Sequence, residues 1–271
     1  MPSRGTPHGS SADRGCWLAR RVTTRLKRQH APVVGTNCGG FTLEAALGVR
    51  PNSIAGPDFA GWEIKQHGVS NLERPHNGTL TLMTPEPDGG WYKDRGVESF
   101  IRTFGYEDTL GRVDRLNFGG HHNVGSINNR TSLGLALVGF DSVRCRISDA
   151  AGSLDLVRAD GTIAASWSFA KLLNHWRKKH ARAAYIPSLR RTGEVIAYSY
   201  GHKVCLGVGT SFELLLGALD RGAVFYDPGL KLEHAASAHP KTKRRSQIRV
   251  GFNNLPDLYD TFEYVDIRLP S

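Results

Sequence analysis

The chain has 271 residues, of which 39% are hydrophobic, so it can fold as one large domain or as two lobes that share a core. No apolar run approaches the roughly 18 residues that a membrane-spanning helix requires, and we therefore expect no membrane partner. The formal net charge at pH 7 is +10 and the pI is about 9.7. This balance favours a nucleic acid as partner, because Lys and Arg release counterions where they meet phosphates, although a basic protein can have an unrelated role.

The four cysteines lie far apart in the sequence and form no CxxC pair. Their spacing argues against a disulfide framework and against a four-cysteine zinc site, and it fits a reducing cytoplasm. The N-terminal region has no apolar secretory core, and its basic stretch over 17–31 is interpreted as a surface helix rather than a transit peptide. We therefore expect a cytoplasmic protein.

Hydrophobic spacing and turn residues predict helices and strands mixed along the chain, which gives an α/β class of the mixed α+β kind. Residues 1–15, rich in Gly, Ser, Pro and Arg, are predicted to be a disordered tail. A helix is predicted over 17–29, and a second helix is predicted to begin after an N-cap at Thr42. Further helices are predicted over 95–106, 168–187 and 209–222. Strands are predicted within 51–68, around a turn at Gly61, and within 77–87, 131–140, 142–149, 154–167 and 246–269.

Three isolated acidic residues precede Glu73 in an apolar, glycine-punctuated region: Glu44, Asp58 and Glu63. In the predicted strand GWEIKQH, Glu63 and Lys65 are two residues apart and point to one face, opposite the apolar neighbours on either side. Asp58 can return to the same face because Gly61 lets the chain bend. The pattern therefore predicts two carboxylates and one ammonium group that converge, although a surface strand with a simple ion pair has the same spacing.

Such a set suits the hydrolysis of phosphodiesters. Carboxylate oxygens hold Mg²⁺ with open water positions, and Mn²⁺ can substitute for it. The metal ion polarises the phosphoryl oxygen and lowers the pKa of bound water. A neighbouring lysine can orient or deprotonate the attacking water, or neutralise charge in the transition state.

The spacing of Pro57, Asp58, Glu63 and Lys65, PD-x4-ExK, resembles the PD-(D/E)xK nuclease signature in a compact form. The wider string NCGGFTLEAALGVRPNSIAGPDFAGWEIKQH resembles the MvaI/BcnI family of type II restriction endonucleases, relatives of the nicking enzyme MutH. Further similar strings include LTLMTPEPDGG, VESFIRTFGY, VGTSFELLLGAL, VFYDPGLKLE and KRRSQIRV, so the resemblance covers about residues 35 to 260.

The resemblance implies a PD-(D/E)xK restriction-endonuclease-like core with two lobes forming a DNA-binding cleft. A catalytic lobe would span 16–115 and a DNA-recognition lobe 116–271. Asp58 and Glu63 would bind the metal ion, with the Ile64 carbonyl as a further ligand, and Lys65 would be the catalytic lysine. Glu44 would add another catalytic carboxylate, although an acidic residue in the first turn of a helix is also favoured by the helix dipole.

Two segments are candidates for DNA contact. The loop FGGHHNVGS presents His121 and His122, which could contact DNA or form an exposed loop tip. In HPKTKRRSQIRV, a charge run enters a predicted strand in which Gln247 and Arg249 share a face; Arg suits guanine and Gln suits adenine. The basic and amide side chains proposed there are Lys241, Lys243, Arg244, Arg245, Gln247 and Arg249.

The sequence thus predicts a Mg²⁺-dependent type II restriction endonuclease that cuts double-stranded DNA at a short site, of the CCNGG type by resemblance. The resemblance also implies a monomer in the cytoplasm of a bacterium or archaeon, with a cognate DNA methyltransferase encoded alongside. A MutH-like enzyme that nicks one strand shares the chemistry. A sequence-specific DNA-binding protein without catalysis would explain the charge but not the arrangement of Asp58, Glu63 and Lys65.

Overall fold

The computed structural model describes Leu43, Leu47 and residues 61–192 and 196–267. Contacts divide the chain into unit 1 (residues 1–78, 178–210 and 259–271) and unit 2 (residues 79–177 and 211–258). The units interleave along the chain, whereas the predicted catalytic and recognition lobes are continuous stretches. The predicted tail over 1–15, the helix over 17–29, Glu44 and Asp58 lie outside the described residues.

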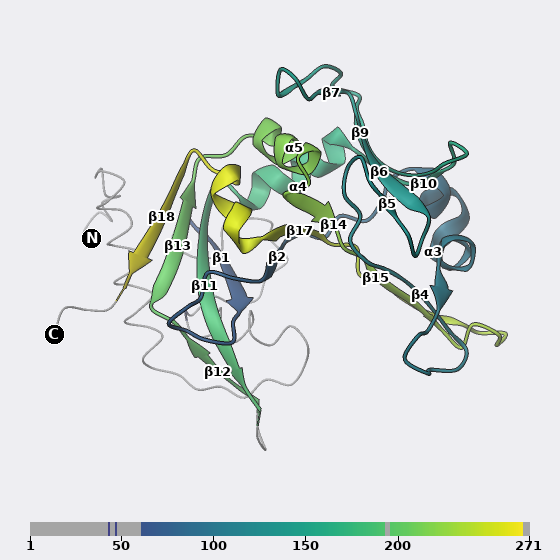
Figure 1. Ribbon diagram of the computed structural model, residues 1–271, viewed down its shortest axis with the longest axis horizontal. Coiled ribbons are helices and arrows are strands. Elements are labelled where there is room, and N and C mark those ends of the chain that lie inside the picture. Colours follow the sequence, from purple (N-terminus) through teal and green to yellow (C-terminus); the bar gives the residue numbers. More distant parts are fainter. Residues whose placement is uncertain (1–42, 44–46, 48–60, 193–195, 268–271) are drawn as a thin grey trace, which may run out of the picture. The chain divides into compact units, whose positions relative to one another are not determined.

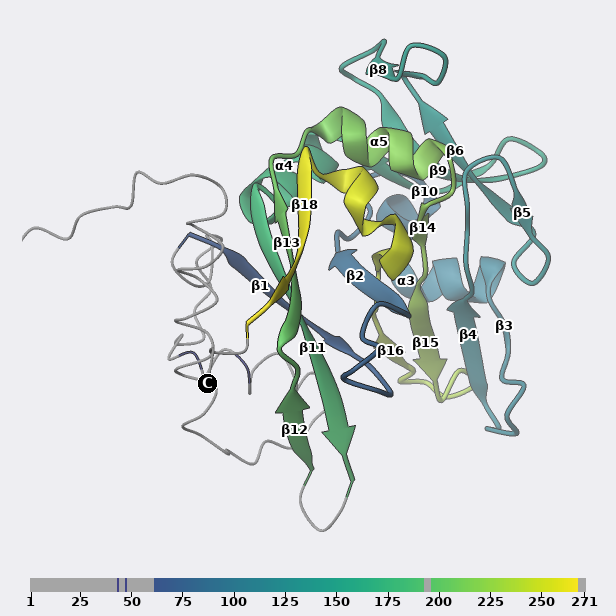
Figure 2. The same ribbon diagram turned by 60° about the vertical axis from the view of Figure 1, so that its left-hand side comes forward.

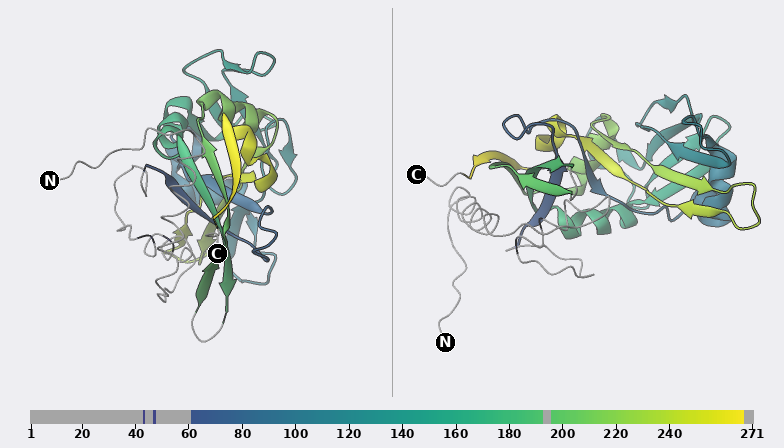
Figure 3. Two further views of the ribbon diagram at one scale, coloured as in Figure 1. Left: turned by 90° about the vertical axis from the view of Figure 1, so that its left-hand side faces the viewer. Right: turned by 90° about the horizontal axis from the view of Figure 1, so that it is seen from below.

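Unit 1 is built on one mixed sheet in the order β1-β11-β13-β18, with β12 also paired to β11 (Figures 1 and 2). β1 runs parallel to β11, and the other pairings are antiparallel; in Figure 3 the yellow β18 runs beside the green β13. The strands are β1 (Glu63–Gly68), β11 (Arg182–Arg191), β12 (Ala197–Tyr200), β13 (Lys203–Val208) and β18 (Thr261–Asp266).

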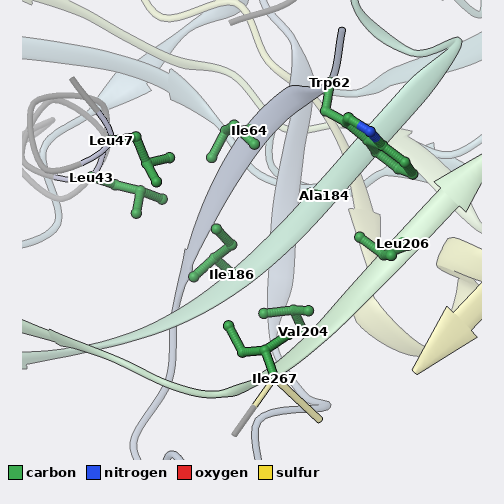
Figure 4. Packing of buried hydrophobic residues seen from close by; sticks show 9 residues of the cluster. All are labelled: Leu43, Leu47, Trp62, Ile64, Ala184, Ile186, Val204, Leu206 and Ile267. Atoms are coloured by element: carbon green, nitrogen blue, oxygen red, sulfur yellow. The ribbon is translucent and has the colours of Figure 1, made fainter. Parts of the chain in front are cut away.

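One face of this sheet is apolar (Figure 4). Ile64 of β1 lies with the side chains of β11 and β13 in a buried cluster, and Leu43 and Leu47, both helical, pack against it. Because side chains alternate along a strand, Glu63 and Lys65 point to the other face. The members of the cluster are Leu43, Leu47, Trp62, Ile64, Ala184, Ile186, Val204, Leu206 and Ile267.

Unit 2 contains several small antiparallel sheets and most of the helical residues described. Three of these sheets have the strand orders β10-β9-β6-β5, β14-β17-β2 and β16-β15-β4-β3, and β7 pairs with β8. Helix α3 (Gly90–Phe104), kinked at Gly96, packs its buried Phe100 and Ile101 side toward β4, β10 and β15. The remaining elements are β2 (Thr79–Met83), β3 (Tyr106–Glu107), β4 (Arg115–Gly119), β5 (Ile127–Asn128), β6 (Leu133–Val138), β7 (Phe140–Asp141), β8 (Arg146–Ile147), β9 (Ser153–Arg158), β10 (Ile163–Ser168), α4 (Phe169–Lys179), α5 (Phe212–Asp220), β14 (Val224–Tyr226), β15 (Gly229–Glu233), β16 (Lys241–Lys243), β17 (Ile248–Gly251) and η1 (Phe252–Leu258).

The mixed α+β class predicted from the sequence is confirmed, but the helix predicted over 168–187 is wrong in its second half. It ends at Lys179, and Arg182–Arg191 forms β11 instead. Pairing with β1 and β13 outweighs the helical spacing, because it buries a run of side chains from Ala183 to Ser188. Pro187 is tolerated because it lies where β11 changes antiparallel partner, after the β13 pairs and before the β12 pairs.

Within the described residues, no helix combines the length and the apolar character needed to span a membrane.

Candidate functional site

The shared face of Glu63 and Lys65 is present in the structure. The Lys65 Nζ atom lies 3.6 Å from Glu63 Oε1, and the two side chains are only 13% and 6% exposed. The Ile64 side chain, which lies between Glu63 and Lys65 in the sequence, is buried in the apolar cluster on the opposite face. This burial holds β1 in the orientation that keeps Glu63 and Lys65 on the other face. A buried carboxylate beside a buried ammonium group is costly to desolvate, so its retention favours a role in binding or chemistry.

The donor chemistry of this strand fits a hard divalent cation, because the Glu63 carboxylate supplies oxygen and its neighbour Lys65 is a cation that can face an anionic substrate. Within the part of the chain that the structure describes, no group of three or more His, Cys, Asp or Glu side chains is placed to hold a metal ion. Asp58 and Glu44, the other carboxylates predicted for this site, lie outside the described residues. Their roles and the role of the Ile64 carbonyl stay predictions.

His67 is the third side chain on this face of β1. It is 6% exposed, and its Nε2 atom donates a hydrogen bond to the Pro75 carbonyl at 3.2 Å. Burial lowers the pKa of His67 to about 4, so the ring is neutral at pH 7. This residue therefore supports the strand rather than carrying a proton in the neutral range.

The predicted basic segment divides between two strands of unit 2. Lys241 and Lys243 lie at the ends of β16, and Lys243 Nζ forms an ion pair with Glu233 Oε2 at 2.9 Å. Arg244 and Arg245 follow and are exposed. These side chains are accessible to a phosphate backbone, although Glu233 offsets part of the charge.

The structure brings two predicted DNA-contact residues together around Asp227. Arg249 of β17 donates from Nη1 to Asp227 Oδ2 at 2.5 Å and from Nη2 to the Thr79 carbonyl at 3.2 Å. His121 Nε2 lies 3.8 Å from the same Asp227 oxygen, and its ring packs on Phe225 with 4.4 Å between centroids. This Asp227 cluster, defined as His121, Asp227 and Arg249, holds a guanidinium group in one orientation beside an exposed imidazole.

Two other residues that are predicted to contact DNA, Gln247 and His122, are buried. Gln247 is 9% exposed and donates to Thr81 Oγ1 at 3.2 Å, so its amide is already engaged within the β14-β17-β2 region. His122 is fully buried, with Nδ1 donating to the Gly120 carbonyl at 2.9 Å and Nε2 2.8 Å from Thr131 Oγ1.

Burial lowers the pKa of His122 to about 4. Because the ring is then neutral and Nδ1 carries the proton, Nε2 accepts a hydrogen bond from the Thr131 hydroxyl. This geometry gives His122 a structural role and leaves His121 as the histidine of the loop FGGHHNVGS that is predicted to contact DNA.

Asp227 was not singled out by sequence reasoning. It follows the apolar strand VFY and precedes Pro228, which makes it look like an ordinary turn residue. The signal that could have found it is its position in VFYDPGLKLE, one of the strings similar to the restriction-endonuclease family.

Glu63 and Lys65 lie two residues apart on β1, and the Asp227 cluster of basic and acidic side chains lies elsewhere in the chain. Together these features are typical of a DNA-cleaving enzyme. The comparisons specify the family. A model of the MvaI/BcnI restriction endonuclease family matches residues 19–259, and the chain belongs to this family. Membership places it in the class of sequence-specific restriction endonucleases, which bind and cut DNA.

Two solved structures are similar over nearly the whole chain. One is described as restriction endonuclease MvaI in complex with cognate DNA; it has 19% identity and a TM-score of 0.65, with 94% of this chain and 99% of that chain covered. The other is MvaI in the absence of DNA, with 18% identity, a TM-score of 0.51, and coverage of 96% and 100%. At these identities the likeness shows the fold. No curated protein sequence matched.

Proposed function

We propose that this protein is a Mg²⁺-dependent type II restriction endonuclease that hydrolyses both strands of double-stranded DNA at a short site. The observation that carries the proposal is the pair of buried side chains, Glu63 and Lys65, 3.6 Å apart on one face of β1. The match of residues 19–259 to a restriction-endonuclease family supports the class of enzyme, and the PD-x4-ExK spacing supports β1 as the position of its site. Mn²⁺ would substitute for Mg²⁺ because the proposed ligands are oxygens.

Glu63, together with Asp58 and the Ile64 carbonyl, would hold the divalent ion, and Glu44 would add a carboxylate. When bound, the ion supplies a Lewis acid for the phosphoryl oxygen and lowers the pKa of bound water. Lys65 would orient the attacking water by a hydrogen bond from its ammonium group and offset the negative charge that develops on the phosphoryl oxygens. The Glu63 carboxylate, in turn, keeps the Lys65 ammonium group in place.

Recognition of the target is proposed for the basic side chains of unit 2. Arg donors match guanine O6 and N7, and an Asp oxygen can accept from cytosine N4, so the Asp227 cluster suits G·C pairs. This supports the short GC-rich site, of the CCNGG type, that the sequence predicts. Lys241, Lys243, Arg244 and Arg245 would hold phosphates and so position the duplex.

The division of labour between a catalytic lobe, predicted over 16–115, and a recognition lobe, predicted over 116–271, is part of the same proposal. Glu63 and Lys65 belong to unit 1, while the Asp227 cluster and the β16 lysines belong to unit 2. We also propose that the enzyme acts as a monomer in a bacterial or archaeal cytoplasm, with a DNA methyltransferase that protects the host sites.

The test is a digest of supercoiled plasmid of known sequence, followed by mapping of the ends. We expect linear fragments with one end sequence in Mg²⁺ and intact plasmid in EDTA. Nicked circles alone would indicate a MutH-like enzyme that cuts one strand. Plasmid that stays intact in Mg²⁺ while a defined sequence is bound would contradict the enzyme and indicate a DNA-binding protein.

A further inference from the structure

The loop between β4 and β5 in unit 2 (Figure 1) carries His121, the exposed histidine of the Asp227 cluster. The His121 side chain is 59% exposed, and its Nε2 atom lies 3.8 Å from Asp227 Oδ2. Its ring packs on Phe225, which is only 8% exposed, with 4.4 Å between the centroids. Exposed side chains ordinarily change rotamer on a fast timescale, so the contacts of the loop decide whether His121 is held in this place.

The backbone of the loop is fixed at three consecutive residues. The Gly120 carbonyl accepts a hydrogen bond from His122 Nδ1 at 2.9 Å, and the His121 carbonyl accepts one from Asn128 Nδ2 at 2.9 Å. The N–H and the carbonyl of His122 both bond to the backbone of Tyr226, at 2.8 and 3.0 Å. Tyr226 directly precedes the aspartate of the cluster, so these bonds tie the loop to the segment that carries the carboxylate.

Asn128 makes the bond that holds His121 itself, and its own amide is fixed in turn. Its Oδ1 atom accepts from the backbone N–H groups of Arg130 at 3.0 Å and Thr131 at 3.2 Å, so Nδ2 is the atom that faces the His121 carbonyl. The amide also needs Gly120 beside it, because a Cβ atom there would lie 2.9 Å from Asn128 Nδ2. Gly120 has a φ of 104°, a conformation that also favours glycine.

This network leaves one side chain of the cluster exposed on an immobilised backbone. Arg249 is held in a comparable way from β17, by Asp227 and by the Thr79 carbonyl. Groups that read bases must lie close to their binding geometry before DNA arrives, because ordering a loop and a side chain at the interface costs affinity. The hydrogen bonds of Asn128 and His122 remove part of that cost for His121.

We propose that His121 is a specificity-determining residue of the Asp227 cluster and that Asn128 is its positioning residue. His121 contacts a base edge beside the guanine that suits Arg249, and Asn128 holds the His121 backbone so that the ring needs little ordering when DNA binds. The inference rests on the proposed function, because that function assigns recognition of the target to this cluster. Asn128 acts through His121 and does not itself touch a base.

The substitution Asn128→Asp isolates the bond to His121. It keeps the oxygen that accepts from the two backbone N–H groups, and it replaces the donating amide group by an oxygen that repels the His121 carbonyl. Asn129→Asp is the matched control, because it makes the same change of charge at the next residue, which is exposed. Any general loss of DNA affinity caused by the added negative charge therefore occurs in both variants.

The measurement is fluorescence anisotropy of DNA binding in Ca²⁺, with a duplex that contains the site mapped by the plasmid digest and with a random duplex. Relative to Asn129→Asp, Asn128→Asp should lower the affinity for the site by about 3- to 30-fold and leave the affinity for the random duplex within about twofold, because only base contact requires an ordered loop. With His121→Ala present, Asn128→Asp should change the ratio of the two affinities by less than about twofold.

A second readout needs no DNA. Because the His121 ring packs on the Phe225 ring, its proton resonances in the NMR spectrum should be shifted by the aromatic neighbour, and His121→Ala identifies them. Asn128→Asp should move these resonances toward the values of a freely exposed histidine. Asn129→Asp should leave them in place.

A merely structural role predicts a lower free energy of unfolding for Asn128→Asp with an unchanged ratio of site to random affinity, and that result would overturn the inference. Wild-type specificity in His121→Ala would overturn it as well. If Asn128→Asp fails to fold, Asn128→Ala decides by the same ratio. If the wild type cuts at one site while Asn128→Asp matches Asn129→Asp, the inference fails and the proposed function stands. If the wild type neither prefers a site nor cuts, both fail.

Discussion

Two acid–base pairs, one in each unit, use opposite charges in different ways. Glu63 and Lys65 lie on one strand with their charged atoms 3.6 Å apart, and their side chains are 6% and 13% exposed. Asp227 and Arg249 come from segments 22 residues apart, are hydrogen bonded at 2.5 Å, and are 17% and 26% exposed. The first pair is looser and more deeply buried, whereas the second is tight and nearer to solvent.

The difference indicates what each pair can do. In the first pair, a carboxylate oxygen suits a hard divalent cation and the neighbouring lysine suits an anionic substrate. An arginine fixed by an aspartate and a backbone carbonyl is preorganised, which favours selective recognition over chemistry. This comparison supports the proposal that the β1 pair carries out catalysis and that the Asp227 cluster recognises the target.

The largest expected effect is that of metal removal. EDTA should abolish cleavage, because the β1 site depends on a divalent ion, but should leave binding of cognate DNA by the unit 2 side chains within a fewfold of its value in Ca²⁺. Gel assays of cleavage and fluorescence anisotropy of binding, on the same protein sample, give both numbers. Full cleavage in EDTA would rule out the metal mechanism.

His67 in unit 1 and His122 in unit 2 are buried histidines whose pKa is lowered to about 4 in the folded protein. Because this is below the ordinary value of 6.5, protonation favours the unfolded chain. Stability should therefore fall as the pH drops from about 6.5 to 4, by up to about 3 kcal/mol for each group.

Replacement of His122 by Asn should flatten this pH dependence. The measurement is urea unfolding, followed by tryptophan fluorescence, at pH 7 and pH 4.5 for the wild type and the variant. His67→Asn provides the same comparison in unit 1. An unchanged loss of stability in His122→Asn would show that this ring is not buried and neutral in the folded protein.

Arg249→Ala should lower affinity for the cognate site by about 1–3 kcal/mol, or roughly 5- to 150-fold, and relax specificity. Affinity falls because the variant lacks both the guanidinium group and its hydrogen bond to Asp227. Arg221→Ala is the matched control, since Arg221 belongs to the same unit but pairs with Asp257. Equal losses on cognate and random DNA would demote Arg249 to a phosphate contact.

The smallest expected effect concerns salt. The logarithm of the binding constant should fall steeply with the logarithm of salt concentration, and Lys241→Ala should make the slope shallower by about 0.9, the value for one phosphate contact. Anisotropy titrations at several salt concentrations measure it. A slope equal to that of the wild type would remove Lys241 from the DNA interface.

The shared face of Glu63 and Lys65 could be predicted because it is local. Alternation along GWEIKQH determines which side chains share a face, so Glu63 and Lys65 follow from spacing alone. The strands predicted within 154–167 depend on equally local signals, and the antiparallel pair of β9 and β10 confirms them.

Residues brought together by long-range pairing could not be predicted in this way. Asp227 meets Arg249 only because β14 pairs with β17. The burial of His122 has the same origin, since its backbone bridges to Tyr226. A sequence pattern that predicts an exposed loop tip contains no information about such a partner.

The central claim is that Glu63 and Lys65 perform catalysis and are not needed for binding. The most direct measurement compares specific DNA binding in Ca²⁺ with cleavage in Mg²⁺ for Lys65→Ala and Asp58→Ala, with Arg221→Ala as a surface control. We expect both active-site variants to bind within a fewfold of the wild type and to cut at least about 10²- to 10³-fold more slowly. A folded Lys65→Ala or Asp58→Ala protein that cuts at nearly the wild-type rate would contradict the account.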